Sequence, residues 1–307
     1  MKKQLFILSL FAFISSLCWS QDYKKVDAIV LKYPKNFSSP TQLAQRISSD
    51  FSNDFDKVRA VYTWIADNIA YDPSESRGYD IQYSSKAELE MKIKKSDAAL
   101  AARVLSKKKA VCQGYSTLFK IVCEDLNIAS KMISGSAKTR VKDIGKKYYS
   151  DHAWNIINIK NKEYLIDVTW GAGTYSDHFE KKMNHFYFLT DPDQFLKKHY
   201  PDNYENALLQ EKIGKQAFLN APLIYDYDYQ LLQPTSGIIK KGKIKFRFLT
   251  TKKVNSINYT VDRKNHKVAT FDNNNYLEFE IDLSHFQKER ELVLFFDYNP
   301  IIGFKLE

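Results

Sequence analysis

Cysteine is scarce in this chain of 307 residues, which contains only three. Cys18 lies in an N-terminal apolar segment, so Cys112 and Cys123 are the two that remain beyond it. The segment that joins them is predicted to be one helix, in which eleven residues separate the Cα atoms by about 16 Å. A disulfide requires a separation of roughly 4.4–6.8 Å. We therefore expect two free thiols, with Cys123 as a buried packing residue and Cys112 as a candidate for chemistry.

Long apolar runs are also missing beyond residue 20, where none approaches the roughly 18 residues of a membrane-spanning helix. The first twenty residues contain Lys2 and Lys3, followed by an apolar core from Leu5 to Leu17. The small residues Cys18 and Ser20 then stand three positions and one position before the expected cleavage site. This order is typical of a secretory signal peptide. We therefore predict that residues 1–20 are removed and that the mature protein is exported, to the periplasm or out of the cell, without a membrane span.

The sequence offers no histidine with a cysteine or paired carboxylates at a metal-ligand spacing. This holds for His178, His185, His199, His266 and His285. We therefore predict neither a metal site nor another cofactor.

The net charge is +10, but the lysines are interleaved with acidic residues along the whole chain. Such a distribution is typical of a solvated surface and not of a nucleic-acid-binding stripe, so no nucleic-acid partner is expected.

Apolar spacing divides the chain into two regions of different character. Residues 40–70 are predicted to be helical, and Ser96 is predicted to cap a short helix over Asp97–Leu105. After about residue 224 the pattern changes to alternating strands at short spacing, which predicts a small β-sandwich. The expected fold class is therefore α+β, with helices packed on an antiparallel sheet and an all-β domain following them.

The residues after Cys112 have the spacing of an amphipathic helix that starts at this cysteine. Apolar side chains recur in steps of three and four residues from Tyr115 to Leu126. Cys112 then lies in the first helical turn, where unpaired backbone N–H groups and the helix dipole favour a thiolate. We predict that Cys112 is a nucleophile.

Two predicted strands, His152–Ile159 and Glu163–Thr169, are separated by a short polar turn. With a two-residue turn, His152 stands opposite Thr169 and has Asp167 as its diagonal neighbour on the same face. A three-residue turn would place the two side chains on opposite faces. A two-residue turn therefore supplies a base beside an acid that can orient it.

These three segments resemble the transglutaminase-like branch of the papain-like thiol enzymes, and particularly the kyphoscoliosis-peptidase type. The resemblance extends over roughly residues 40–225 and includes the stretch Leu189–Phe195 and the run His199-Tyr200-Pro201. It implies that Cys112 is the catalytic nucleophile, that His152 is the general base and acid, and that Asp167 orients the imidazole.

We therefore expect a signal peptide at residues 1–20, a thiol-enzyme domain at 21–224 with a papain-like core, and an immunoglobulin-like β-sandwich at 225–307. The expected activity is hydrolysis or acyl transfer on protein or peptide amides through a thioester. The alternative is a catalytically silent module that binds a peptide or an envelope protein, because a fold does not determine its function.

Overall fold

The structure is a computed structural model that describes residues 23–76, 82–273, 276–286 and 288–307. The signal peptide predicted for residues 1–20 lies outside the described residues. Within them, no helix combines the length and the apolar character needed to cross a membrane.

The predicted helical region between residues 40 and 70 is confirmed as two helices, α2 (Pro40–Asp50) and α3 (Asp54–Asn68). Each begins at a polar cap, because the side chain of Ser39 accepts a hydrogen bond from the Gln42 N–H and that of Asn53 accepts one from the Phe55 N–H. A short helix, α1 (Lys24–Val30), precedes them and packs on α3.

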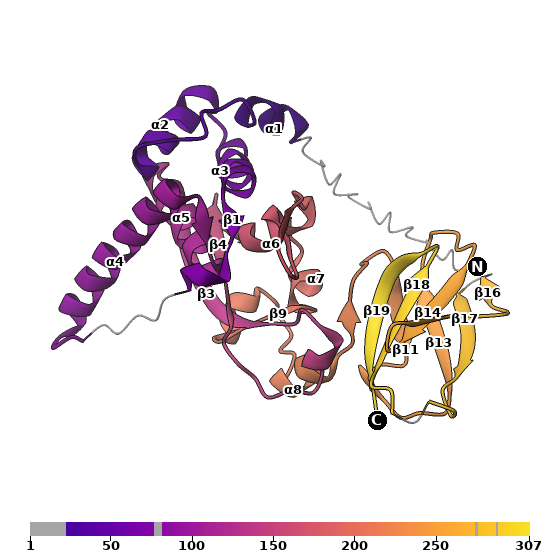
Figure 1. Ribbon diagram of the computed structural model, residues 1–307. Coiled ribbons are helices and arrows are strands. Elements are labelled where there is room, and N and C mark those ends of the chain that lie inside the picture. The colour runs from indigo at the N-terminus through magenta and orange to yellow at the C-terminus, as the bar shows by residue number, and fades with distance from the viewer. Residues whose placement is uncertain (1–22, 77–81, 274–275, 287) are drawn as a thin grey trace, which may run out of the picture.

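The predicted short helix capped by Ser96 is wrong, because the structure has one long helix, α4 (Lys86–Lys107). Ser85 caps it through the Glu88 N–H, and the chain leaves it at Lys108, whose φ is 56°. The added turns are rich in lysine and glutamate, which are good helix formers even on an exposed surface. Figure 1 shows this part of α4 projecting from the body of the protein.

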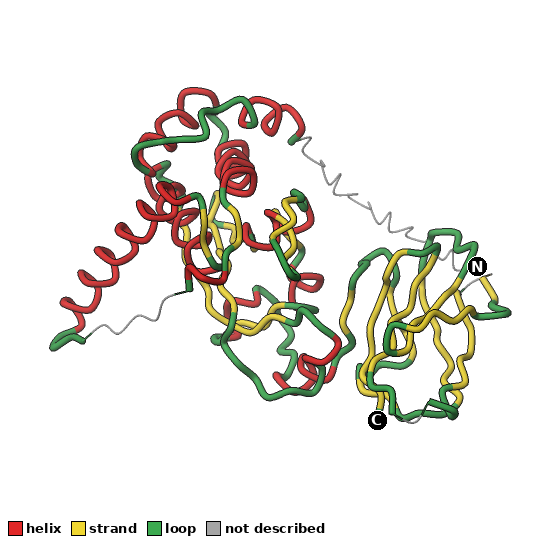
Figure 2. Tube along the Cα trace, viewed as in Figure 1, coloured by secondary structure: helices red, strands yellow, loops and turns green. Residues whose placement is uncertain are grey.

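The predicted helix at Cys112 is confirmed as α5 (Cys112–Asp125). Its apolar face is buried against the other helices and against an antiparallel sheet (Figures 1 and 2). The sheet has the order β8 (Phe188–Thr190), β5 (Lys162–Ile166), β4 (His152–Ile159), β3 (Ala129–Ala137) and β9 (His199–Pro201). Two-stranded pairs join β1 (Ala70–Tyr71) to β2 (Lys109–Ala110) and β6 (Gly173–Tyr175) to β7 (Phe179–Lys181).

The hairpin of β4 and β5 has the two-residue turn on which the predicted site depends. Ile159 pairs with Lys162, and the intervening Lys160 and Asn161 have φ values of 53° and 63°. Two positive φ values suit the right-handed twist of the strands. The predicted strand is too long, however, because β5 ends at Ile166 and the chain then turns into a short helix, α6 (Val168–Ala172).

The C-terminal region forms two antiparallel-rich sheets whose apolar faces enclose a second core (Figure 2). The first sheet contains β10 (Leu223–Ile224), β12 (Ile238–Ile239), β14 (Ile257–Val261), β15 (Lys264–Lys267), β18 (Glu291–Phe296) and β19 (Asn299–Leu306). The second contains β11 (Gln230–Gln233), β13 (Lys243–Leu249), β16 (Asp272–Asn273) and β17 (Leu277–Asp282). The predicted α+β class, with helices on an antiparallel sheet followed by β-structure, is confirmed.

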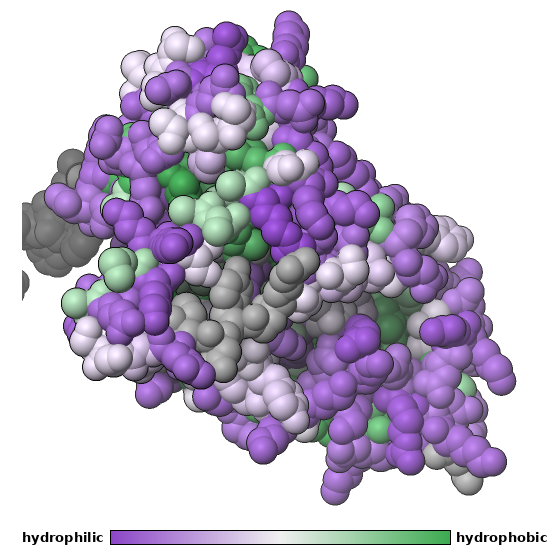
Figure 3. Space-filling view, turned by 60° about the vertical axis from the view of Figure 1, so that its left-hand side comes forward, coloured by the Kyte–Doolittle hydropathy of each residue, from purple (hydrophilic) through white to green (hydrophobic). Residues whose placement is uncertain are grey.

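A small apolar cluster joins the two regions. It contains Val141, Ile144 and Leu223, with Ile238 and Val293 packed against them. Strand β10 extends the link, because it pairs with β19 of the C-terminal sheet. The face shown in Figure 3 is mostly hydrophilic, with apolar residues in small groups between polar ones.

Candidate active site

Cys112 is the first residue of α5 and is partly exposed. The extended residue Val111 precedes it, and the carbonyl of Val111 accepts the first helical hydrogen bonds, from the N–H groups of Gly114 at 2.8 Å and Tyr115 at 3.2 Å. The N–H groups of the first helical turn have no acceptor within the helix. The thiol therefore lies at the positive end of the helix dipole, as the sequence predicted.

The other thiol, that of Cys123, is fully buried in the core on the same helix. Burial raises the pKa of Cys123 well above its ordinary value. Both cysteines are free. The two thiols thus differ in access to solvent, which agrees with the prediction of packing for Cys123.

His152, at the start of β4, interacts with both Asp167 and Cys112. Its Nε2 lies 2.7 Å from Oδ2 of Asp167. Burial lowers the pKa of His152, but the charge and hydrogen bond of Asp167, together with a hydrogen bond to Cys112, raise it above its ordinary value. Because Nε2 faces Asp167, the nitrogen that faces the sulfur is Nδ1.

Asp167 is fully buried at the junction of β5 and α6 and acts as the N-cap of that helix. Its Oδ1 accepts the backbone N–H of Trp170 at 3.0 Å, which leaves Oδ2 for the imidazole. Burial raises the pKa of Asp167, but the charge of His152 and the hydrogen bonds of the neighbouring imidazoles lower it well below its ordinary value. An ionised carboxylate only accepts hydrogen bonds, so Nε2 of His152 carries a proton.

The structure therefore brings the three predicted residues together, although they come from a helix, a strand and a helix cap. A ring of this tautomer can accept the proton of the thiol on Nδ1 while the carboxylate stabilises the positive charge that forms. The arrangement is chemically suited to form a thiolate and imidazolium pair.

A second histidine at the site was missed by the sequence analysis. Nε2 of His199, on β9, lies 3.0 Å from the same Oδ2 of Asp167. The ligand atoms of His152, Asp167 and His199 lie within 4.8 Å of one another, so this buried set is also one that could hold a metal ion. Spacing along the chain does not detect it, because its members come from separate elements. The only sequence signal was the run His199-Tyr200-Pro201.

Aromatic side chains surround the imidazole of His152. The Trp170 ring centroid lies 5.4 Å from it and that of Trp154 lies 6.0 Å from it. On the side of the nucleophile, Tyr71 packs against Tyr175 with ring centroids 5.5 Å apart. Burial first and then the charge of Cys112 raise the pKa of Tyr71, so this phenol is close to the sulfur.

Two other groups of the same domain take no part in the site. The indole Nε1 of Trp64 donates to the Pro34 carbonyl at 3.1 Å, and the ring is fully buried, in agreement with a packing role. Asp177 and His178 are exposed in the turn between β6 and β7. Neither group contributes to the chemistry described above.

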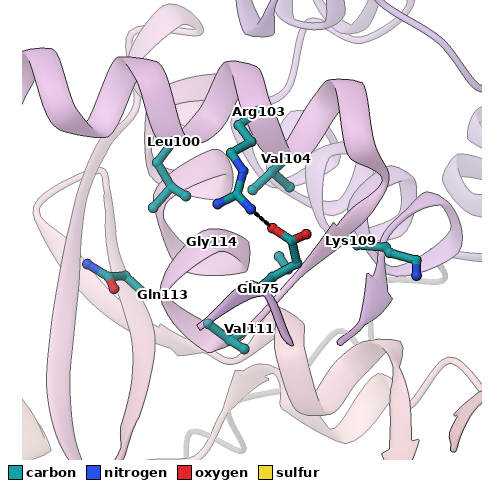
Figure 4. A pocket seen from close by; sticks show the side chains of 9 residues that line it. Glu75, Leu100, Arg103, Val104, Lys109, Val111, Gln113 and Gly114 are labelled. Atoms are coloured by element: carbon teal, nitrogen blue, oxygen red, sulfur yellow. Dashed lines mark hydrogen bonds and ion pairs between the residues drawn. The ribbon is translucent and has the colours of Figure 1, made fainter. Parts of the chain in front are cut away.

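A small pocket adjoins the N-terminal turn of α5 (Figure 4). Gln113 and Gly114, which follow Cys112, form part of its wall. Arg103 from α4 forms an ion pair with Glu75 across it. The pocket therefore places one charged pair beside the turn that carries the thiol.

Comparisons with known proteins identify a family for part of the chain. Residues 41–166 match the model of the Transglutaminase-like superfamily. The matched residues form a transglutaminase-like domain. It is 28% identical to kyphoscoliosis peptidase of Mus musculus over 204 residues, and 28% identical to that of Homo sapiens over 205 residues.

These alignments of the transglutaminase-like chain cover 65% of its length but only 28% and 29% of the mouse and human proteins. The chain thus spans less than a third of the length of these curated relatives. A solved structure of a TGase also matches, with a TM-score of 0.30 and 18% identity, and the match covers 57% of this chain and 40% of the other.

Proposed function

We propose that this transglutaminase-like chain is a thiol hydrolase or acyl transferase that acts on amide bonds of proteins or peptides. The observation that carries the proposal is the position of the His152 ring, which is hydrogen-bonded to Asp167 and lies close enough to Cys112 for that thiol to raise the pKa of the imidazole. The match to the Transglutaminase-like superfamily model also supports the proposal, and the mouse and human relatives described above are named peptidases.

In the proposed reaction, Nδ1 of His152 takes the proton of Cys112, and the thiolate attacks the amide carbonyl carbon. The tetrahedral oxyanion lies at the N-terminus of α5, where the Cys112 N–H can donate to it. The C–N bond then breaks, and the imidazolium of His152 gives its proton to the leaving amine. The product of this half-reaction is a thioester on Cys112.

The second half-reaction decides between two activities that share this thioester. Attack by water releases a carboxylic acid and completes a hydrolysis. Attack by a lysine amine forms a new amide and completes a crosslink. In both reactions His152 takes the proton of the attacking group, and the sulfur leaves as a thiolate.

The two cysteines of α5, Cys112 and Cys123, allow a direct test of this proposal. We expect Cys112→Ala to abolish both hydrolysis of a peptide library and incorporation of a labelled amine into it. Cys123→Ala, the matched control, should retain catalysis, because that thiol is buried in the core away from the imidazole. Both assays are to be read by mass spectrometry. Equal activity of the wild type and Cys112→Ala contradicts the proposal.

The second candidate is a catalytically silent module that binds a peptide or an envelope protein, because a fold does not determine its function. If the protein is such a binding module, the wild type and Cys112→Ala should bind the same library peptides with equal affinity, and neither should convert them to products.

We also propose that the protein is exported, on the basis of the charged and apolar pattern of residues 1–20. N-terminal sequencing of the protein recovered from its producing cells should then begin at Gln21. A protein that retains Met1 in every cell fraction contradicts export.

A further inference from the structure

The carboxylate of Asp167 serves two imidazoles and not one. Its Oδ2 accepts from Nε2 of His152 at 2.7 Å and from Nε2 of His199 at 3.0 Å, while Oδ1 accepts the Trp170 N–H. The reaction described above uses His152 alone. His199 is 1% exposed and has no part in that reaction, so its position requires another explanation.

The ring of His199 is neutral. Ionised Asp167 can only accept, so the proton of His199 lies on Nε2. Among the described residues, no partner hydrogen-bonds to its buried Nδ1, and a second proton there would be a buried donor without an acceptor. Burial also lowers the pKa of His199 to about 4. The neutral ring therefore acts as a donor to the carboxylate.

Packing holds the His199 ring in place. It stacks on Phe195 with centroids 4.1 Å apart and planes 22° apart, and it lies 4.4 Å from the Trp170 ring. Strand β9 carries His199 and pairs with β3, where His199 stands opposite Ala137. His152 reaches Asp167 from β4, on the other side of β3 in the sheet order. The carboxylate is thus held from two separate strands.

We propose that His199 is a positioning residue for the thiol chemistry, which fixes the Asp167 carboxylate and shares its negative charge so that His152 can release its proton. This inference rests on the proposed function. A hydrogen bond to an ionised carboxylate stabilises its charge. Without that bond, the full charge of the Asp167 carboxylate would act on the His152 imidazolium and hold its proton more firmly. His152 would then transfer its proton to the leaving amine more slowly.

The test compares His199→Asn with His199→Gln. The amide of glutamine reaches the position of the imidazole Nε2, whereas that of asparagine is one methylene shorter. We expect His199→Asn to lower kcat roughly tenfold, the lower end of the loss seen when a hydrogen-bond partner that orients a metal-ligating side chain is removed. KM should stay nearly constant because His199 is buried.

The pH profile separates positioning from general packing. In His199→Asn the alkaline limb of the pH profile of kcat/KM should shift to higher pH, because His152 holds its proton more firmly. His199→Gln should recover most of the rate and the wild-type limb. A merely structural role would lower the thermal stability of the variants without moving the limb.

A second readout needs no substrate. The rate at which iodoacetamide alkylates Cys112, followed by peptide mass mapping, should reach its half-maximum at lower pH in His199→Asn than in wild type, because a firmly held imidazolium stabilises the thiolate. If His199→Asn does not fold, His199→Phe keeps the aromatic packing and also removes the donor. An unchanged or upward-shifted labelling profile overturns the role of His199. Absence of turnover in wild type counts instead against the proposed function.

Discussion

The carboxylate of Asp167 is fully buried and yet ionised, which a protein interior tolerates only with close partners. Its partners are two imidazoles and one backbone N–H. The pKa of Asp167 lies below its ordinary value of 3.8 and that of His152 lies above its ordinary value of 6.5. The stability of the fold must therefore depend on pH through these two residues.

The sign of this pH dependence follows from the lowered pKa of Asp167 and the raised pKa of His152. Asp167 stabilises the fold above about pH 3.8, and its contribution is lost as the pH falls through the pKa that Asp167 has in the folded protein. His152 stabilises the fold fully below about pH 6.5, and its contribution is lost as the pH rises through the pKa that His152 has in the folded protein. The pair thus contributes most between these two values.

Asp167→Asn removes both contributions at once. We expect it to lower the free energy of unfolding by about 3–5 kcal/mol near pH 5, the usual cost of breaking a buried pair. The difference from wild type should shrink at pH 9, since His152 has by then lost part of its contribution. Urea unfolding at both pH values measures it, and Asp177→Asn on the exposed turn should match wild type at each. An equal loss at pH 5 and pH 9 would contradict this account.

At the scale of elements, the close approach of β9 to β3 places His199 beside Asp167. Gly135 on β3 stands opposite both His152 and Pro201. A Cβ atom on Gly135 would overlap the Tyr200 carbonyl and lie 2.5 Å from Cη2 of Trp154. Only glycine therefore lets the backbone of β9 come this near.

Gly135→Ala should force β9 away from β3 and carry His199 with it. We expect a loss of about 1–3 kcal/mol in the free energy of unfolding, as for other overpacked sites, together with a fall in turnover. Gly214→Ala is the control, because nothing lies within 4 Å of a Cβ at that position. Thermal unfolding and the peptide assay measure both effects, and equal behaviour of the two variants would show that the approach is not critical.

The elements show what sequence patterns can predict. The spacing after Cys112 and the turn at Lys160-Asn161 are local, and both predictions were correct. The end of β5 was missed because Asp167 is a helix cap, a preference of aspartate that competes with strand formation. His199 was missed because the pairing of β3 with β9 joins segments distant in the sequence. Non-local pairing leaves no periodic signal in either strand.

At the scale of the whole molecule, the two regions are linked by shared packing and by strand pairing. Leu223 is fully buried in the cluster with Val141 and Ile144, and β10 pairs with β19. The Phe186 ring also stacks on Tyr227 with centroids 4.3 Å apart. Loss of structure in the C-terminal sheets would expose these contacts, so we expect the regions to unfold together.

Tryptophan fluorescence can test this coupling, because Trp64, Trp154 and Trp170 all lie before the C-terminal β-region. Phe304 is fully buried in the distant β-core, and Phe304→Ala should cost about 3–5 kcal/mol there. If the regions unfold as one unit, the tryptophan signal should shift to lower denaturant by as much as the circular dichroism signal. Tyr298→Ala, at a residue 82% exposed in the same region, should leave both midpoints in place. A shift in circular dichroism alone would mean that the C-terminal sheets unfold independently of the residues that carry the thiol site.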